Sequence, residues 1–311
     1  MISKFMNVEL KFFKTNLDFF INLYLAKKLP QTLLFTGDKN IGKLDLTYHL
    51  VNFILSEHEK TKYDTKLHKI NSDSKTFKQL SKNLHPNFFL ISPNDNRKII
   101  EISQIKNLQK FLNNSSFNNL PKIIVINESE CLNLSSSNAL LKLLEETYSN
   151  VFFILIHDIK KTLIPTVKSR CISFNFFLNN NDRIERINDI LDNQYDNLSS
   201  DFKNKYLSPI FFNELQDYCK KNSLELEKIN LDNLLSDIFF KKNFKRSTFV
   251  YNNFFSLIQL FLYKRIEEKL EIEKSFSLLK YFTKRFDDVI KYNLDFESYV
   301  LEFKYLIYDE K

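Results

Sequence analysis

Residues 33–55 read LLFTGDKNIGKLDLTYHLVNFIL and contain both glycines of the chain, Gly37 and Gly42. The apolar run 33–35 is typical of a buried strand, and residues 43–55 carry apolar side chains at helical spacing. The stretch between them has the spacing G-x-x-x-x-G-K, which between a strand and a helix forms a loop whose backbone N–H groups cradle phosphates. A chain of 311 residues with so little glycine is expected to need backbone freedom at these two positions.

The end of this loop departs from the phosphate-binding pattern. A working loop has Ser or Thr after the lysine, and its hydroxyl ligates Mg²⁺, whereas here Leu44 follows Lys43. Two interpretations fit these residues. The loop binds ATP or ADP weakly, or it is a strand–turn–helix that keeps only the shape of a phosphate-binding loop. No cofactor is required in either case. The predicted residues of this degenerate nucleotide site are Gly37, Asn40, Ile41, Gly42, Lys43 and Leu44.

A second element of the expected metal site is also altered. The buried strand 122–126 is followed by Asn127 and Glu128, where ATPases of this kind place an Asp that supports Mg²⁺ and then an acid that polarises water. Asn127 is neutral, and Glu128 remains as a candidate base or as a solvated acid at a strand end. Because two elements have lost ligand chemistry, metal-assisted hydrolysis is not expected, and no metal site is predicted.

Strands alternate with helices up to about residue 172. Apolar runs predict further strands at 88–91 and 151–156, and helices are expected to begin near Ser103 and near Ser135. This alternation predicts a parallel sheet covered by helices on both faces. From residue 182 onward the pattern is helical.

Composition limits the remaining classes of protein. Hydrophobic residues make up 43% and charged residues 27%, as in an ordinary globular protein, and the net charge of +7 only weakly favours nucleic acid. The three cysteines form no C-x-x-C pair, which argues against a zinc site and suggests a reducing cytoplasm. No apolar run is long enough to span a membrane. The basic run 241–246 is expected at the surface.

Several motifs lie in one continuous order. They are His85-Pro86-Asn87, the segment 100–106 (IEISQIK), the acidic strand end, the segment 138–146 (NALLKLLEE), the segment 163–166 (LIPT) and Ser169-Arg170-Cys171. Their order and spacing resemble the AAA+ subunits of bacterial clamp loaders, and within them the delta-prime family of DNA polymerase III. The resemblance covers residues 30–172 well, and the C-terminal third only in helical character and length.

This resemblance implies a domain order. It comprises an α/β AAA+ P-loop domain at 1–172, a small helical lid at 173–217 and an all-α collar for oligomerisation at 218–311. It also implies a hetero-oligomeric ring with delta and gamma/tau subunits that loads the sliding clamp onto primed DNA. Relatives often carry a four-cysteine zinc module before the His-Pro motif, but residues 56–84 contain only His58 and His68, so no zinc is expected.

Within such a ring the resemblance implies a stationary subunit without intrinsic ATPase activity. Arg170 would be an arginine finger acting in trans on the ATP of a gamma/tau neighbour, and Ser169 would orient its loop. The alternative for Arg170 is an arginine that pairs with a carboxylate at a subunit edge, but the motif context favours the finger. Lys106 and Lys110 lie on a helix that faces DNA in related loaders, although a solvated lysine face explains them equally.

Two other functions remain open from the sequence. An active gamma/tau-like AAA+ motor would need Mg²⁺ held without the ligands that Leu44 and Asn127 lack. A free-standing P-loop binding protein with another partner would form no complex with delta and gamma/tau.

Overall fold

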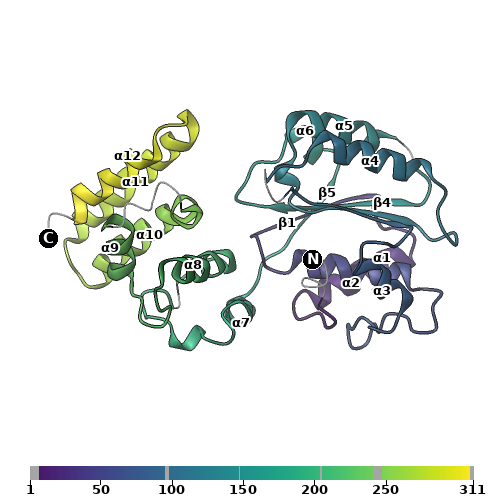
Figure 1. The fold of residues 1–311 in the computed structure, drawn as a ribbon, viewed down its shortest axis with the longest axis horizontal. Coiled ribbons are helices and arrows are strands. Elements are labelled where there is room, and N and C mark those ends of the chain that lie inside the picture. Colours follow the sequence, from purple (N-terminus) through teal and green to yellow (C-terminus); the bar gives the residue numbers. More distant parts are fainter. Residues whose placement is uncertain (1–6, 95–97, 147, 204, 241–246, 309–311) are drawn as a thin grey trace. The chain divides into compact units, whose positions relative to one another are not determined.

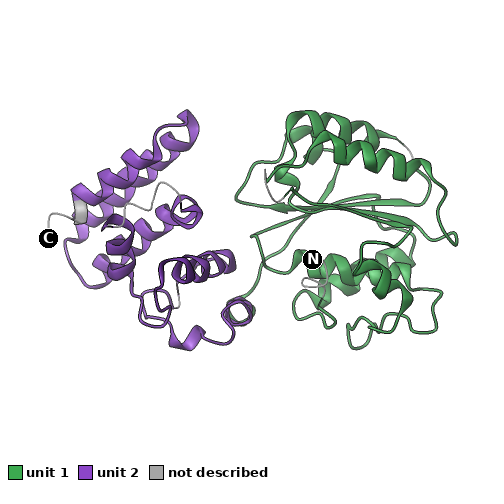
Figure 2. Ribbon diagram, viewed as in Figure 1, with its two compact units in different colours: residues 1–182 green, residues 183–311 purple. Residues whose placement is uncertain are grey.

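The computed structural model describes residues 7–94, 98–146, 148–203, 205–240 and 247–308, and residues 307 and 308 are described by their backbone alone. The chain forms two compact units, residues 1–182 and 183–311, which Figure 2 distinguishes by colour. The basic run 241–246, expected at the surface, lies outside the described residues. No helix in the described part of the chain combines the length and apolarity that a membrane crossing needs.

The first unit is built on a parallel sheet with the strand order β2-β3-β4-β1-β5. The strands are β1 (Thr32–Gly37), β2 (Phe88–Ile91), β3 (Lys122–Ile126), β4 (Val151–Asp158) and β5 (Ile172–Asn175). β1 lies between β4 and β5, with Thr32 opposite Phe153 and Leu33 opposite Ile172. The loop after β1 is therefore held by strands on both sides.

Helices cover both faces of this sheet (Figure 1). One face carries α1 (Lys14–Leu25), α2 (Lys43–Leu55) and α3 (Lys75–Leu80), and the other carries α4 (Ile102–Asn113), α5 (Leu134–Glu145) and α6 (Pro165–Lys168). Side chains alternate between two cores: Leu33 and Phe35 pack on the α1–α2 side, and Leu34 packs on the α4–α5 side. The predicted α/β fold, with a parallel sheet and flanking helices, is confirmed.

β5 is absent from the sequence prediction, which placed the end of the strand pattern near residue 172. Its residues Ile172–Asn175 read ISFN and are mostly exposed, because β5 lies at the edge of the sheet and pairs only with β1. It therefore lacks the continuous apolar run that marks the buried strands. Phe176, which follows it, is 2% exposed and belongs to the core on the α1–α2 side.

The second unit is helical, as predicted for the C-terminal region. Its helices are α7 (Asn180–Ile190), which begins just before the unit boundary, α8 (Pro209–Asn222), α9 (Leu231–Phe240), α10 (Thr248–Glu267), α11 (Ile272–Tyr292) and α12 (Phe296–Phe303). A single apolar core runs from Ile187 in α7 to Phe303 in α12. The division of this region into a lid ending at 217 and a collar beginning at 218 stays a prediction.

Candidate functional site: the loop after β1 and the arginine after α6

The two glycines of the loop are required for different reasons. Gly42 has φ of 105° and caps the start of α2, a left-handed conformation that other residues adopt at a cost. Gly37 has no room for a side chain, because a Cβ there would collide with the carbonyl oxygen of Phe176. Gly42 is therefore needed for its backbone conformation, and Gly37 is needed because the main chain at Phe176 approaches it closely.

Lys43 is turned back onto its own loop. Its Nζ donates hydrogen bonds of 2.5 Å to the carbonyl oxygens of Gly37 and Asp38, and the residue is 5% exposed. Burial lowers the pKa of Lys43 to about 8, against the opposing effect of the nearby carboxylates of Asp158, Glu130 and Asp38. The ammonium that would neutralise a phosphate is thus already engaged by main-chain oxygens.

The side chains on either side of Gly42 and Lys43 are apolar. Leu44 packs against the apolar core beside α1 and α2. Ile41 is 3% exposed, and Asn40 is exposed with a left-handed φ of 64°. The loop thus has the predicted strand–loop–helix setting, with an apolar side chain where a hydroxyl would ligate Mg²⁺.

The end of β3 lies near this loop through an ion pair. The Lys39 Nζ donates to Glu128 Oε2 at 2.6 Å, and Glu128 has a left-handed φ of 54°. Burial lowers the pKa of Lys39, but the Glu128 hydrogen bond and charge outweigh it and raise that pKa above its ordinary value. Asn127 is half-buried, and its backbone N–H donates to Ile91 O at 2.8 Å. The Lys39–Glu128 pair thus joins the end of β3 to the loop that ends at Lys43.

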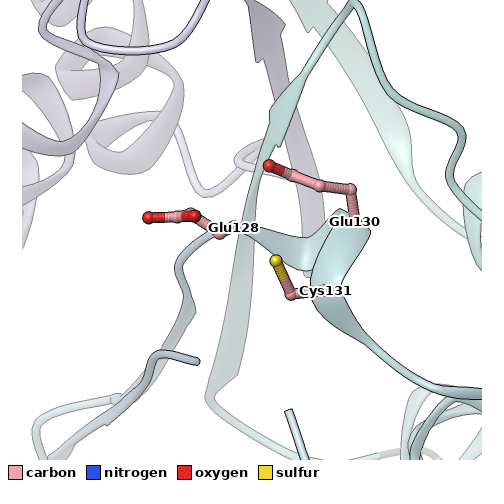
Figure 3. Close-up of side chains that lie close together, drawn as sticks. All are labelled: Glu128, Glu130 and Cys131. Carbon is pink, nitrogen blue, oxygen red and sulfur yellow. The ribbon is translucent and has the colours of Figure 1, made fainter. Parts of the chain in front are cut away.

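Three potential ligands meet just after β3, as Figure 3 shows: Glu128, Glu130 and Cys131. Their ligand atoms all lie within 4.8 Å of one another. Glu130 Oε2 accepts the backbone N–H of Asp158 at 3.1 Å, and burial followed by the two acids raises the pKa of the Cys131 thiol. Of the two acids, Glu128 already forms an ion pair with Lys39.

Arg170 lies in a second place, after α6 and beside the end of α5. Its Nη1 donates to Thr166 O at 3.0 Å, and its Nη2 forms an ion pair with Glu145 Oε1. Ser169 Oγ donates to the same Thr166 oxygen at 3.0 Å. The Arg170 side chain is 37% exposed and that of Glu145 is 54% exposed, so the guanidinium remains accessible from solvent.

The neighbouring residues anchor α6 in the unit. Val167 is completely buried, and burial raises the pKa of the Cys171 thiol to about 12. Cys171 is therefore a protonated, half-buried thiol at neutral pH, which matches a packing role. The orientation of α6 next to α5 is set by these apolar contacts.

The other residues singled out in the sequence belong neither to the loop after β1 nor to the turn that holds Arg170. Lys106 and Lys110 are exposed on α4. His68, in the segment where relatives carry a zinc module, pairs through Nε2 with Asp18 Oδ1 at 2.8 Å, and His58 is exposed. Sequence reasoning missed Lys39 and Glu145 as partners of predicted residues, because those partners lie far away along the chain.

The amino-acid sequence was compared with protein-family models and with curated proteins, and both comparisons found DNA polymerase III subunits. The family model described as "DNA polymerase III, delta subunit" matches residues 14–179, more than half of the chain. A DNA polymerase III subunit delta' of Buchnera aphidicola subsp. Baizongia pistaciae is 26% identical over 257 residues, covering 77% of this chain and 71% of that protein. The subunit delta' of Pseudomonas aeruginosa is 31% identical over 100 residues, covering 32% of this chain and 30% of that protein.

One solved structure aligns with most of this chain. The DNA polymerase III gamma subunit-related protein of Thermotoga maritima covers 91% of this chain and 96% of its own, at 15% identity and a TM-score of 0.42. The match with the Pseudomonas relative spans less than a third of either protein. The family model, by contrast, spans α1 through β5 and with them both the loop at Lys43 and the arginine after α6. On that match, the chain belongs to the DNA polymerase III delta subunit family.

Proposed function

We propose that the chain is a delta-prime-like subunit of the DNA polymerase III clamp loader that does not hydrolyse ATP itself and supplies Arg170 in trans to a neighbouring ATPase subunit. Its partners are the delta and gamma/tau subunits, and the assembled ring loads the sliding clamp onto primed DNA. The subunit acts as a fixed wall of the ring. Its place of action is the cytoplasm.

The observation that carries the inactive role is the engagement of Lys43. Its ammonium donates to Gly37 O and Asp38 O, so nucleotide phosphates would have to displace two short hydrogen bonds of a buried side chain. Leu44 packs into the core and offers no oxygen to Mg²⁺. Weak ATP or ADP binding remains compatible with this loop, but hydrolysis at this site is not proposed.

The end of β3 supports the same role. Asn127 stands where a metal-supporting carboxylate is needed, and Glu128 is neutralised by Lys39 at 2.6 Å. A general base must be free to contact the attacking water, whereas the Glu128 carboxylate already accepts a hydrogen bond from Lys39. No metal ion or cofactor is therefore assigned to the loop.

Arg170 suits a role at a subunit boundary. Its guanidinium is always charged, presents a rigid fork of donors and is accessible at 37% exposure. α6 is anchored through the buried Val167, so the arginine projects from a fixed support. Ser169 ties the same turn to Thr166 O. Lys106 and Lys110, exposed on α4, are the proposed DNA contacts of this subunit.

Steady-state ATPase measurements test the proposal. A complex reconstituted with gamma/tau, delta, clamp and primed DNA is compared with the isolated chain, for wild type and Arg170→Ala. We expect no turnover by the isolated chain and about a tenfold loss in the Arg170→Ala complex, less than the 10³–10⁵ of fingers elsewhere because other ring subunits also supply them. Lys168→Ala, which removes an exposed charge from the same helix, is the matched control and keeps the wild-type rate.

Three results would contradict the proposal as a whole or in part. Turnover by the isolated wild-type chain, equal to that of the Leu44→Thr/Asn127→Asp double variant, would identify an active motor. Failure of the chain to assemble with delta and gamma/tau would instead identify a protein with another partner. An unchanged rate in the Arg170→Ala complex, with assembly intact, would remove the finger role alone.

A further inference from the structure

The two acids that end the motif 138–146 have different partners. Glu145 Oε1 forms the ion pair with Arg170 Nη2, whereas Glu146 Oε2 accepts the hydroxyl of Tyr148. The adjacent carboxylates therefore carry the same charge, but only Glu145 engages the arginine. Substitution of Glu146 can therefore serve as a control for substitution of the adjacent Glu145.

The arginine is held at two points of its fork. Nη1 donates to Thr166 O at 3.0 Å while Nη2 contacts Glu145, so one hydrogen bond comes from its own helix and the other from the end of α5. Because Val167 anchors α6 in the core, the backbone of this segment is fixed and the freedom of Arg170 lies in its side chain. The carboxylate therefore selects one side-chain orientation among several.

We infer that Glu145 is a positioning residue that holds the Arg170 guanidinium until the phosphates of a neighbouring nucleotide replace its carboxylate. This inference rests on the proposed function, since it assigns the arginine a phosphate in trans. Glu145 engages the guanidinium through Nη2 alone, and a phosphate oxygen can accept a charge-assisted hydrogen bond from that same nitrogen. Both side chains are substantially exposed, so the pair is weak enough for a triphosphate of higher charge to replace it.

Holding the arginine has a quantitative consequence. If only a fraction of the molecules has the Arg170 guanidinium free of Glu145, the apparent affinity of Arg170 for the phosphate is the intrinsic affinity multiplied by that fraction. An exposed ion pair of ordinary strength corresponds to about a two- to fivefold effect. Removal of the Glu145 charge is therefore expected to raise both the reactivity of Arg170 and its apparent affinity for the neighbouring nucleotide by that factor.

Chemical modification of the full-length chain tests the holding contact directly. The rate of hydroxyphenylglyoxal addition to Arg170 is followed by peptide mass spectrometry for wild type, Glu145→Gln and Glu146→Gln. We expect a two- to fivefold faster reaction in Glu145→Gln and the wild-type rate in Glu146→Gln. Raising the salt concentration should accelerate the wild-type reaction towards that of Glu145→Gln, because salt screens an exposed pair. Equal rates in wild type and Glu145→Gln would overturn the inference.

The reconstituted complex gives a second readout. For Glu145→Gln we expect the KM for ATP to fall two- to fivefold relative to wild type and to Glu146→Gln. A loss of kcat comparable with that of Arg170→Ala would show that Glu145 is needed in the active arrangement, which contradicts a releasing role. If Arg170→Ala leaves the complex unaffected, the finger proposal fails, while the modification rates still report whether Glu145 holds the arginine.

Discussion

At the scale of single residues, the surroundings of Lys43 decide its chemistry more than its place in a motif does. The spacing after Gly37 predicts a phosphate-binding lysine, yet its Nζ donates to two carbonyl oxygens of the loop. These two hydrogen bonds supply donors to main-chain oxygens of the loop. The motif therefore persists as a structural element when the hydroxyl at position 44 is replaced by an apolar side chain.

The depressed pKa of Lys43 gives a testable pH dependence. Its pKa is about 8 in the folded chain and 10.5 in its ordinary state, so between these values the unfolded chain binds more protons and the free energy of unfolding rises with pH. Measured by urea denaturation, the stability of wild type relative to Lys43→Met should increase by about 1.5 kcal/mol between about pH 8 and pH 9.5. In the difference between wild type and Lys43→Met, the contributions of all other titrating groups cancel. A pH-independent difference would show that Lys43 keeps its ordinary pKa.

Residue-level prediction succeeded where chemistry and spacing were local. The rarity of glycine identified Gly37 and Gly42, and the structure gives each a physical reason. The partners of Lys39 and Arg170 could not be predicted, because Glu128 and Glu145 approach them only through the packing of separate elements. Ion pairs of this kind carry no periodic signal in the sequence.

At the scale of elements, burial determined which strands could be predicted. β2 and β3 have the predicted bounds, because a strand buried on both faces is a continuous apolar run. The helix starts differ: α4 is capped by Glu101 with Gln104 in a reciprocal capping box, and α5 by Asn133, each upstream of the serine expected to begin it. Several polar residues near a helix start can serve as caps, so the choice among them depends on tertiary context.

The end of α4 depends on a lysine from the neighbouring strand. Lys122 is 3% exposed, and its Nζ donates to Phe111 O at 2.7 Å and Leu112 O at 3.1 Å. Lys122→Met should lower the free energy of unfolding by about 2 kcal/mol, because buried carbonyls lose their donor. Lys110→Met, an exposed position in the same helix, should change it by less than about 0.5 kcal/mol. Similar effects of the two substitutions in urea denaturation would contradict this capping role.

At the scale of the whole molecule, each unit contains its own apolar core. The two cores of the first unit are formed by residues up to Phe176, and the core of the second begins at Ile187. Sequence reasoning predicted the change from α/β to helical pattern and placed the end of the first domain at residue 172, where β5 begins. An edge strand with alternating polar residues resembles a loop until its pairing with β1 is known.

Separate cores predict that the first unit folds alone. A fragment of residues 1–182 should show the same amide-exchange protection in β1, β3 and β4 as the full chain. A fragment of residues 1–171 should be less protected in β1, because it lacks both the β5 hydrogen bonds and the buried ring of Phe176. Equal protection in the two fragments would show that β5 contributes little, and loss of protection in the longer one would show that the first unit depends on residues 183–311.

The central position of β1 also bears on how the chain acquires its fold during synthesis. Leu33 is opposite Ile154 on one side and Ile172 on the other, so this strand emerges from the ribosome long before either partner exists. At 5–20 residues per second the nascent chain spends on the order of 10 s with an unpaired apolar strand. During that interval α1 and α2 are the structures available to cover it, which gives the N-terminal helices a protective role before the sheet is complete.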